Sequence, residues 1–127
     1  MQVETYFENL VVQSSSLGAA QTYTTKPTGA VLNAKLCVVF LDVLQLADNA
    51  KIVVVLEDSA DGINWRTIGA IIDTSVGDVD AEVALYGDAS IENLGAFARF
   101  KLVISEREAG SLRIDATVNL KAVWKPY

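Results

Sequence analysis

Apolar side chains occupy every second position across residues 112–124, and this alternation constrains the fold more than any other feature of the chain. Successive side chains of a β-strand point to opposite faces of its sheet, so one face of this segment is apolar. A helix would spread the same side chains around its circumference. The segment therefore predicts a strand with one hydrated face and one buried face, the buried face carrying Leu112, Ile114, Ala116, Val118, Leu120, Ala122 and Trp124.

Further strands are predicted from runs of β-branched and aromatic residues that lie between turn-forming residues. They fall near residues 7–13, 21–25, 36–45, 51–57, 65–72, 80–86 and 97–105. The intervening turns are short and rich in Gly, Asp and Asn, which tolerate turn geometry. Strands at this spacing predict an all-β fold: a two-layer antiparallel β-sandwich of seven to nine strands, either jelly-roll-like or immunoglobulin-like.

The length of 127 residues and the apolar content of 51% fit a single domain, 1–127, with a core of its own. The longest apolar run, residues 36–41, is far shorter than the ~18 residues of a membrane span. No basic region followed by an apolar stretch opens the sequence, so we expect no signal peptide and synthesis in a cytoplasm. The single cysteine, Cys37, lies in an apolar strand and is predicted to be a small buried hydrophobe.

Two of the predicted strands, residues 36–44 and 50–57, are apolar on both sides. Such strands lie centrally in a sheet, or another layer or subunit covers their second face. Residues 1–12 mix apolar and acidic side chains and predict either an edge strand or an arm that docks on a neighbouring subunit. If they form an arm, the rest of the chain should fold without them. The candidate assembly interface consists of Tyr6, Phe7, Leu10 and Val12.

Residue types that carry enzymatic chemistry are scarce. The chain has no histidine, which removes the commonest general base and excludes any Ser-His-Asp or Cys-His arrangement. One cysteine cannot build a Cys-rich zinc site, and no Gly-rich loop has a phosphate-binding pattern. We therefore predict a protein that is not an enzyme, with no cofactor and no catalytic residues. The net charge of −6 repels phosphate backbones, so no nucleic-acid partner is predicted, and no membrane partner either.

Five aspartates crowd two predicted loops and raise the question of calcium, which prefers oxygen ligands. The first loop does not follow the EF-hand pattern, because aligning Gly62 with the EF-hand glycine places Ile68 where a glutamate is required. We favour turn-forming aspartates over metal ligands and assign no metal site, and calcium bound across adjacent loops stays open as the alternative. The aspartates concerned are Asp58, Asp61, Asp73, Asp78 and Asp80.

The segment from Leu56 to Trp65 is the most distinctive stretch of the chain. An apolar strand runs into Ser59-Ala-Asp-Gly62 and resumes at Asn64-Trp65, which predicts a hairpin with the Asp-Gly pair in the turn. We expect Trp65 and Trp124 to pack in the core, with a ligand platform at Trp65 as the alternative.

This segment resembles the Ser-x-Asp-Gly-x-x-Trp hairpin of small structural proteins in tailed bacteriophages. Those proteins continue to an aromatic-x-Arg strand, here the strand that begins Phe97-Ala-Arg-Phe, and finish on a long alternating strand; residues 50–124 follow that order. The resemblance implies a virion component, such as a head decoration or accessory protein, with no catalytic residues. The same hairpin also occurs in discoidin-like carbohydrate binders.

The sequence thus leads to a non-enzymatic virion structural protein, made in the host cytoplasm and assembled in multiple copies. Its expected partners are copies of itself, a capsid shell protein or a tail shell protein. A carbohydrate-binding or cell-surface-binding β-sandwich module is the alternative, and it requires aromatic side chains exposed on one face or loop end.

Overall fold

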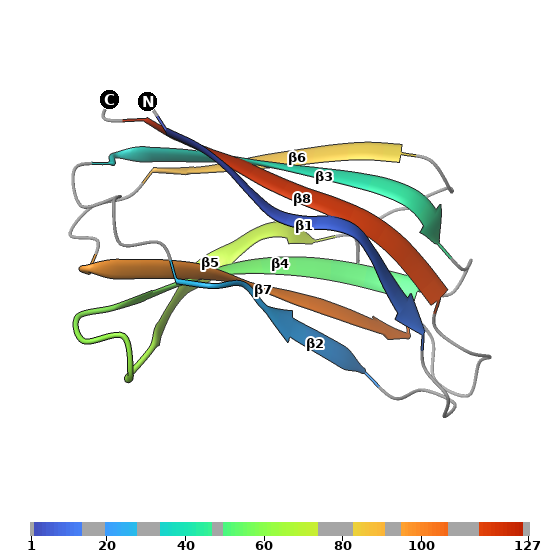
Figure 1. The fold of residues 1–127 in the computed structure, drawn as a ribbon, viewed down its shortest axis with the longest axis horizontal. Coiled ribbons are helices and arrows are strands. Elements are labelled where there is room, and N and C mark those ends of the chain that lie inside the picture. The colour runs from blue at the N-terminus through green and yellow to red at the C-terminus, as the bar shows by residue number, and fades with distance from the viewer. Residues whose placement is uncertain are drawn as a thin grey trace.

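Antiparallel β-strands in two facing sheets form the computed structural model of the chain (Figure 1). The structure describes residues 2–13, 20–27, 34–46, 50–73, 83–90, 95–106 and 115–125. Within these ranges there are eight strands: β1 (Gln2–Gln13), β2 (Gln21–Thr24), β3 (Leu36–Leu46), β4 (Ala50–Ser59), β5 (Arg66–Asp73), β6 (Val83–Ser90), β7 (Phe97–Glu106) and β8 (Asp115–Lys125).

The strand order identifies the sandwich as a jelly roll. One sheet, called sheet A, has the order β1-β8-β3-β6, and the other, sheet B, has the order β2-β7-β4-β5. In an immunoglobulin sandwich the first two strands are neighbours in one sheet, whereas β1 and β2 lie in different sheets here. Eight strands that pass back and forth between two sheets are the jelly-roll arrangement. The predicted two-layer antiparallel β-sandwich is confirmed.

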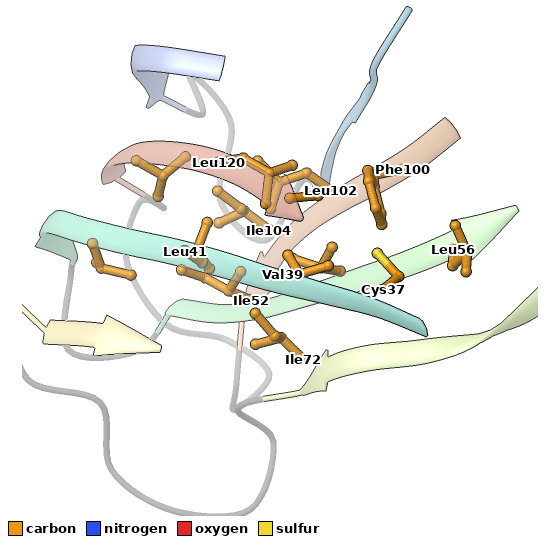
Figure 2. Packing of buried hydrophobic residues seen from close by; sticks show 14 of the residues in the cluster. Cys37, Val39, Leu41, Ile52, Leu56, Ile72, Phe100, Leu102, Ile104 and Leu120 are labelled. Carbon is orange, nitrogen blue, oxygen red and sulfur yellow. The ribbon is translucent and has the colours of Figure 1, made fainter. Parts of the chain in front are cut away.

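The core lies between the sheets and consists of the apolar side chains that alternate along the strands, as the sequence predicted. On β8 every second residue, from Val118 to Trp124, is buried, and β3, β4 and β7 supply matching rows (Figure 2). Cys37 is among the fully buried residues, and burial raises the pKa of its thiol to about 12. The prediction that Cys37 is a small buried hydrophobe is confirmed, because such a thiol stays protonated at neutral pH.

The two strands predicted to be apolar on both sides occupy interior positions. β3 lies between β8 and β6, and β4 lies between β7 and β5. Their inward residues are fully buried, whereas outward residues such as Val38 and Val55 are only half-buried. The predicted central placement is confirmed, and the outer faces keep apolar side chains near solvent.

In the described ranges, no helix is long and apolar enough to cross a membrane.

Candidate functional site

The β4–β5 hairpin is held by its own polar side chains. The Asp61 carboxylate accepts hydrogen bonds from the backbone N–H groups of Ile63 and Asn64, both at 2.8 Å. The Ser59 hydroxyl accepts a bond from the Gly62 N–H at 2.9 Å and donates one to Asp61, also at 2.9 Å. Gly62 has a φ of 76°, in the left-handed region that suits glycine. The predicted Asp-Gly turn is confirmed, and the N–H donors lower the pKa of Asp61.

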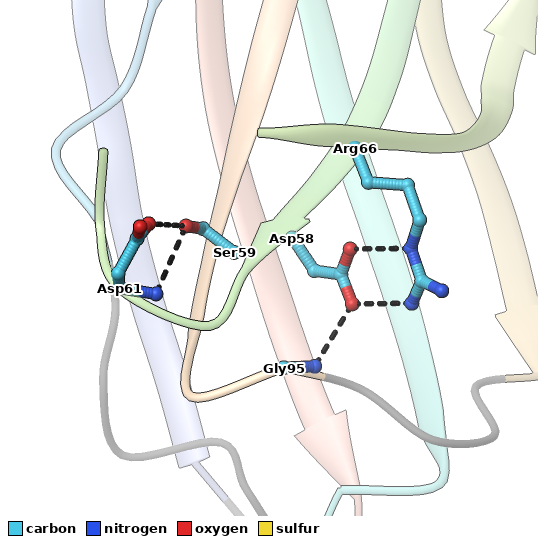
Figure 3. A network of polar contacts seen from close by, with 5 residues as sticks. All are labelled: Asp58, Ser59, Asp61, Arg66 and Gly95. Carbon is cyan, nitrogen blue, oxygen red and sulfur yellow. Dashed lines mark hydrogen bonds and ion pairs between the residues drawn. The ribbon is translucent and has the colours of Figure 1, made fainter. Parts of the chain in front are cut away.

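Asp58 anchors this hairpin to a distant segment of the chain (Figure 3). Its side chain is 3% exposed, and its two oxygens accept hydrogen bonds from Nε and Nη2 of Arg66 at 2.9 and 2.7 Å. The Gly95 N–H donates a third bond at 2.8 Å. The bond from Arg66 is the main cause that lowers the pKa of Asp58, and the pKa of Arg66 rises in return. A carboxylate with three donors stays ionised despite its burial.

A second polar cluster lies on the outer face of sheet B. Glu57 is buried there, with Arg99 Nε at 2.9 Å and Lys101 Nζ at 3.9 Å from its carboxylate oxygens. The guanidinium carbon of Arg99 lies 4.0 Å from the centre of the Trp65 ring. The cation therefore bridges a buried acid and an aromatic face.

Trp65 is half-buried and lies outside the core cluster, whereas Trp124 is buried within it. The prediction of core packing is confirmed for Trp124 and is wrong for Trp65. The alternation of β7 contained the missing signal: Ala98 and Phe100 point inward, so Arg99 must point outward, where an aromatic ring can cover it. Sequence spacing could not tell which aromatic that would be, because Trp65, which directly precedes β5, and Arg99 of β7 are far apart in the chain.

The two clusters border a hollow beside the hairpin. Its volume is about 410 Å³. Its wall is formed by the Trp65 indole, by the polar side chains of Asn64 and Arg66, and by the backbone of Gly95. Such a surface offers one flat apolar wall and several hydrogen-bonding groups, which suits binding of a polar ligand better than acid–base chemistry. The full set of lining residues is Asp58, Ser59, Ala60, Asn64, Trp65, Arg66 and Gly95.

The aspartates considered for calcium do not converge in the ranges that the structure describes. Asp58 and Asp61 use their carboxylate oxygens to accept bonds from nearby donors, as turn and anchor residues do. Asp73 is exposed at the end of β5. Asp78 and Asp80 lie outside the described residues. Over those described, no three acidic, His or Cys side chains form a group that could hold a metal ion.

The predicted assembly residues all lie on β1, which is an edge strand of sheet A. Tyr6, Phe7 and Leu10 pack against the core, and the Tyr6 hydroxyl accepts a hydrogen bond from Trp124 Nε1 at 3.0 Å. Tyr6 also meets Phe100 edge to face, with ring centres 5.0 Å apart. Val12 pairs with Ala116 of β8 in the strand ladder. An interface formed by these four residues stays a prediction.

No known family model and no curated protein matches this sequence. Solved structures do resemble its fold. A chain in the structure of infectious bursal disease virus, strain Gx, is similar over 95% of this chain, with a TM-score of 0.59 and 12% identity. A chain in the structure of the Gt strain is similar over 98%, with a TM-score of 0.60 and 10% identity. This protein spans only 30% and 32% of those chains. At such identity the likeness establishes a shared fold: the jelly roll of this chain also occurs within chains of a virus.

Proposed function

We propose that the protein is a non-enzymatic structural component of a virus particle, present in multiple copies. One observation carries the proposal: the strand order β1-β8-β3-β6 over β2-β7-β4-β5, in a fold shared along 95% of the chain with a chain in the structure of a virus. Jelly rolls are a recurrent architecture of viral capsid domains. Fold alone does not fix function, so the polar clusters and surfaces must be consistent with the role. The clusters at Asp58 and Glu57 are consistent, since both serve to hold strands together.

Within that role we propose a head decoration or accessory protein of a tailed bacteriophage or phage-derived particle. The hairpin from Ser59 to Trp65 supports this, because its turn forms as in the Ser-x-Asp-Gly-x-x-Trp pattern. The partners would be copies of the chain itself and a capsid or tail shell protein. Synthesis in the host cytoplasm agrees with a single cysteine whose thiol is buried and reduced.

We also propose that β1 contributes to assembly. The proposed interface is centred on Tyr6, Phe7, Leu10 and Val12, of which the first three are partly buried against the core and so also hold β1 in position. Val3 and Val11 point outward and are among the exposed large apolar residues. An edge strand also presents one row of backbone groups that another strand can pair with.

Quantitative mass spectrometry of virus particles tests the role. Particles purified on a density gradient from cells that make this chain should contain it in many copies at a fixed ratio to the shell protein. Immunogold labelling should then mark the heads. Label on the tails would overturn the head assignment alone. A chain found only in the soluble fraction, with unlabelled particles, would contradict the structural role.

The hollow beside Trp65 favours a second candidate, carbohydrate or cell-surface binding. A half-exposed indole next to an amide and a guanidinium is the kind of surface on which a sugar ring can stack and form hydrogen bonds. A glycan array with the wild type and Trp65→Ala separates the candidates. Binding that the substitution abolishes would support the module. Absence of binding, together with particle incorporation of Trp65→Ala, would rule it out.

A further inference from the structure

The charges that line the hollow beside the β4–β5 hairpin compensate each other. Among its described lining residues, Asp58 and Arg66 are the charged ones. Their side chains face each other and are joined by two hydrogen bonds, at 2.9 and 2.7 Å (Figure 3). The Gly95 N–H donates a further bond to the same carboxylate. A ligand that enters the hollow therefore meets an ion pair that is already formed, and not a net charge.

An anionic ligand is poorly matched to this lining. It would bind the Arg66 guanidinium, whose Nε and Nη2 already donate to the carboxylate of Asp58. The anion would then lie beside the negative charge of Asp58. Repulsion between the two like charges opposes the hydrogen bond that the anion would gain, and it is weakly screened where Asp58 is buried.

A cationic ligand is poorly matched for a different reason. The guanidinium carbon of Arg99 lies 4.0 Å from the centre of the Trp65 ring, so a cation already occupies one face of the indole. Arg99 does not line the hollow, so the indole surface turned toward the hollow is one that Arg99 leaves uncovered. A second cation there would be attracted to the ring and repelled by Arg99 across it. The Asp58 carboxylate, 3% exposed and bound by three donors, is a poor partner for that cation.

The hydrogen-bonding groups of the hollow are held in place by the fold. The Asn64 side-chain amide donates to Asp61 Oδ2 at 2.9 Å, and the Asn64 backbone N–H donates to Asp61 Oδ1 at 2.8 Å. Arg66 is fixed by its two bonds to Asp58, although its side chain is 65% exposed. A site ordered in advance loses little conformational entropy when a ligand binds. The Trp65 indole adds a flat apolar wall on which a ring can pack.

We propose that this hollow binds an uncharged sugar residue, with the sugar ring on the Trp65 indole and its hydroxyl groups hydrogen-bonded to Asn64 and Arg66. A neutral ring with several hydroxyl groups matches an apolar wall, an amide and a compensated ion pair. The volume of 410 Å³ lies in the lower part of the ~300–1,000 Å³ range of small-ligand pockets, which suits a short saccharide. The proposal rests on the carbohydrate-binding candidate above and names its ligand class.

Titration of the isotope-labelled full-length chain, followed by nuclear magnetic resonance, tests the ligand class. The probes are the methyl glycosides of glucose, galactose and mannose, the corresponding uronates, and glucosamine as the cation. At least one neutral glycoside should shift the indole N–H signal of Trp65, with a dissociation constant on the order of 10 mM or lower. The uronate of that sugar and glucosamine should bind at least about tenfold more weakly. The indole signal of Trp124 is the internal control and should not move, because its N–H donates to Tyr6 in the core.

Three variants connect the binding to the residues that line the hollow. Trp65→Ala should abolish the shifts that the neutral glycoside causes in the backbone amide signals of Asn64 and Arg66. Ile63→Thr is the matched control, since Ile63 is 79% exposed on the same hairpin and does not line the hollow, and it should bind as the wild type does. Asp58→Asn removes the charge that compensates Arg66, so the uronate should gain at least about tenfold relative to the neutral sugar. The amide spectrum of each variant shows whether the fold is retained.

A Trp65 signal that no neutral glycoside shifts overturns this inference. A uronate or amine that binds as tightly as the neutral sugar also overturns it, but then carbohydrate binding stands and the ligand class alone is wrong. A preference for neutral sugars that Asp58→Asn leaves unchanged would contradict the role of the ion pair. The glycan array with Trp65→Ala judges the carbohydrate candidate separately. Mass spectrometry of purified particles judges the structural role, whichever sugar binds.

Discussion

At the scale of single residues, the buried charges explain how the ends of the strands are held. Asp58 continues the inward row of β4, opposite Ala98 of β7, at a point where the core gives way to loops. A carboxylate at that position is costly unless donors satisfy it, and Arg66 and Gly95 do so from two other segments. The polar anchor therefore specifies where the hairpin and the start of β7 meet.

Substitution of Asp58 should expose this role in stability and in its dependence on pH. Asp58→Asn should lower the free energy of unfolding by about 2 kcal/mol at pH 7. The charge-assisted hydrogen bonds of the carboxylate are lost, and the neutral Asn side chain keeps one hydrogen bond through its amide group. The pKa of Asp58 is lower in the folded chain than the usual ~3.9 of an unfolded one, so its contribution is present above about pH 4. It disappears as the pH falls through the folded value.

Urea unfolding between pH 7 and pH 2 measures both effects. The wild type should lose stability steeply below pH 4, and Asp58→Asn should have a shallower slope because the amide does not titrate. Arg66→Lys keeps the charge but loses the two-point bond, so it should fall between the two. Equal acid slopes in all three proteins would show that Asp58 does not stabilise the fold as its contacts indicate.

The two tryptophans should respond very differently to truncation. Trp124→Ala removes a fully packed side chain and leaves the Tyr6 hydroxyl without its donor, so it should cost about 3–5 kcal/mol. Trp65→Ala removes a half-exposed ring and its contact with Arg99, which should cost about 1 kcal/mol. Single-tryptophan variants provide the optical check. Iodide should quench Trp65 in Trp124→Phe and should not reach Trp124 in Trp65→Phe; the reverse pattern would contradict the structure.

At the scale of strands, local pattern was sufficient to find the elements. Predicted and observed bounds agree within three residues for most strands: for example, 36–45 against Leu36–Leu46 and 97–105 against Phe97–Glu106. Alternation of apolar side chains and turn-forming residues are local signals, so they can be recognised in a single sequence without knowing which strands pair. The partition into sheets A and B is not local, since β1 pairs with β8 and β2 with β7. The candidate site was missed in part for the same reason: Asp58 and Arg66 face each other across the local β4–β5 hairpin, but Gly95 reaches Asp58 only after the strands of sheet B have assembled.

The close approach of β5 and β6, which belong to different sheets, requires a glycine at position 87 because any larger residue would carry a Cβ there. A Cβ at Gly87 of β6 would lie 2.3 Å from the Ile71 carbonyl oxygen of β5, closer than real Cβ contacts allow. Gly87→Ala should therefore force the two edge strands apart and lower the free energy of unfolding by about 1–3 kcal/mol. Gly69→Ala is the control, because no atom lies within 4 Å of its added Cβ. Denaturant titration compares the two; equal stability would mean that β5 and β6 do not approach so closely in solution.

At the scale of the whole molecule, the first and last strands close the sandwich together. β1 pairs with β8 along nearly its entire length, from Gln2 opposite Trp124 to Gln13 opposite Asp115 (Figure 1). β8 in turn lies between β1 and β3 in sheet A. Both ends of the described chain must therefore be in place before this sheet is complete. Folding dominated by such long-range pairings is slow compared with helical proteins.

Deletion of residues 1–12 decides whether the N-terminal segment is a structural strand or a detachable arm. The structure predicts loss of the native fold, because Tyr6, Phe7 and Leu10 leave the core and uncover Trp124, Leu120 and Val118. Removing these three partly buried side chains forfeits about 2–5 kcal/mol of apolar burial, which is a large part of the 5–15 kcal/mol that stabilises a whole domain. Near-UV circular dichroism should lose its tryptophan signal and the cooperative thermal transition should vanish. A double variant, Val3→Thr with Val11→Thr, changes only exposed residues of β1 and should stay folded. A truncated chain with a native spectrum would restore the arm interpretation and show that β8 can form the edge of sheet A alone.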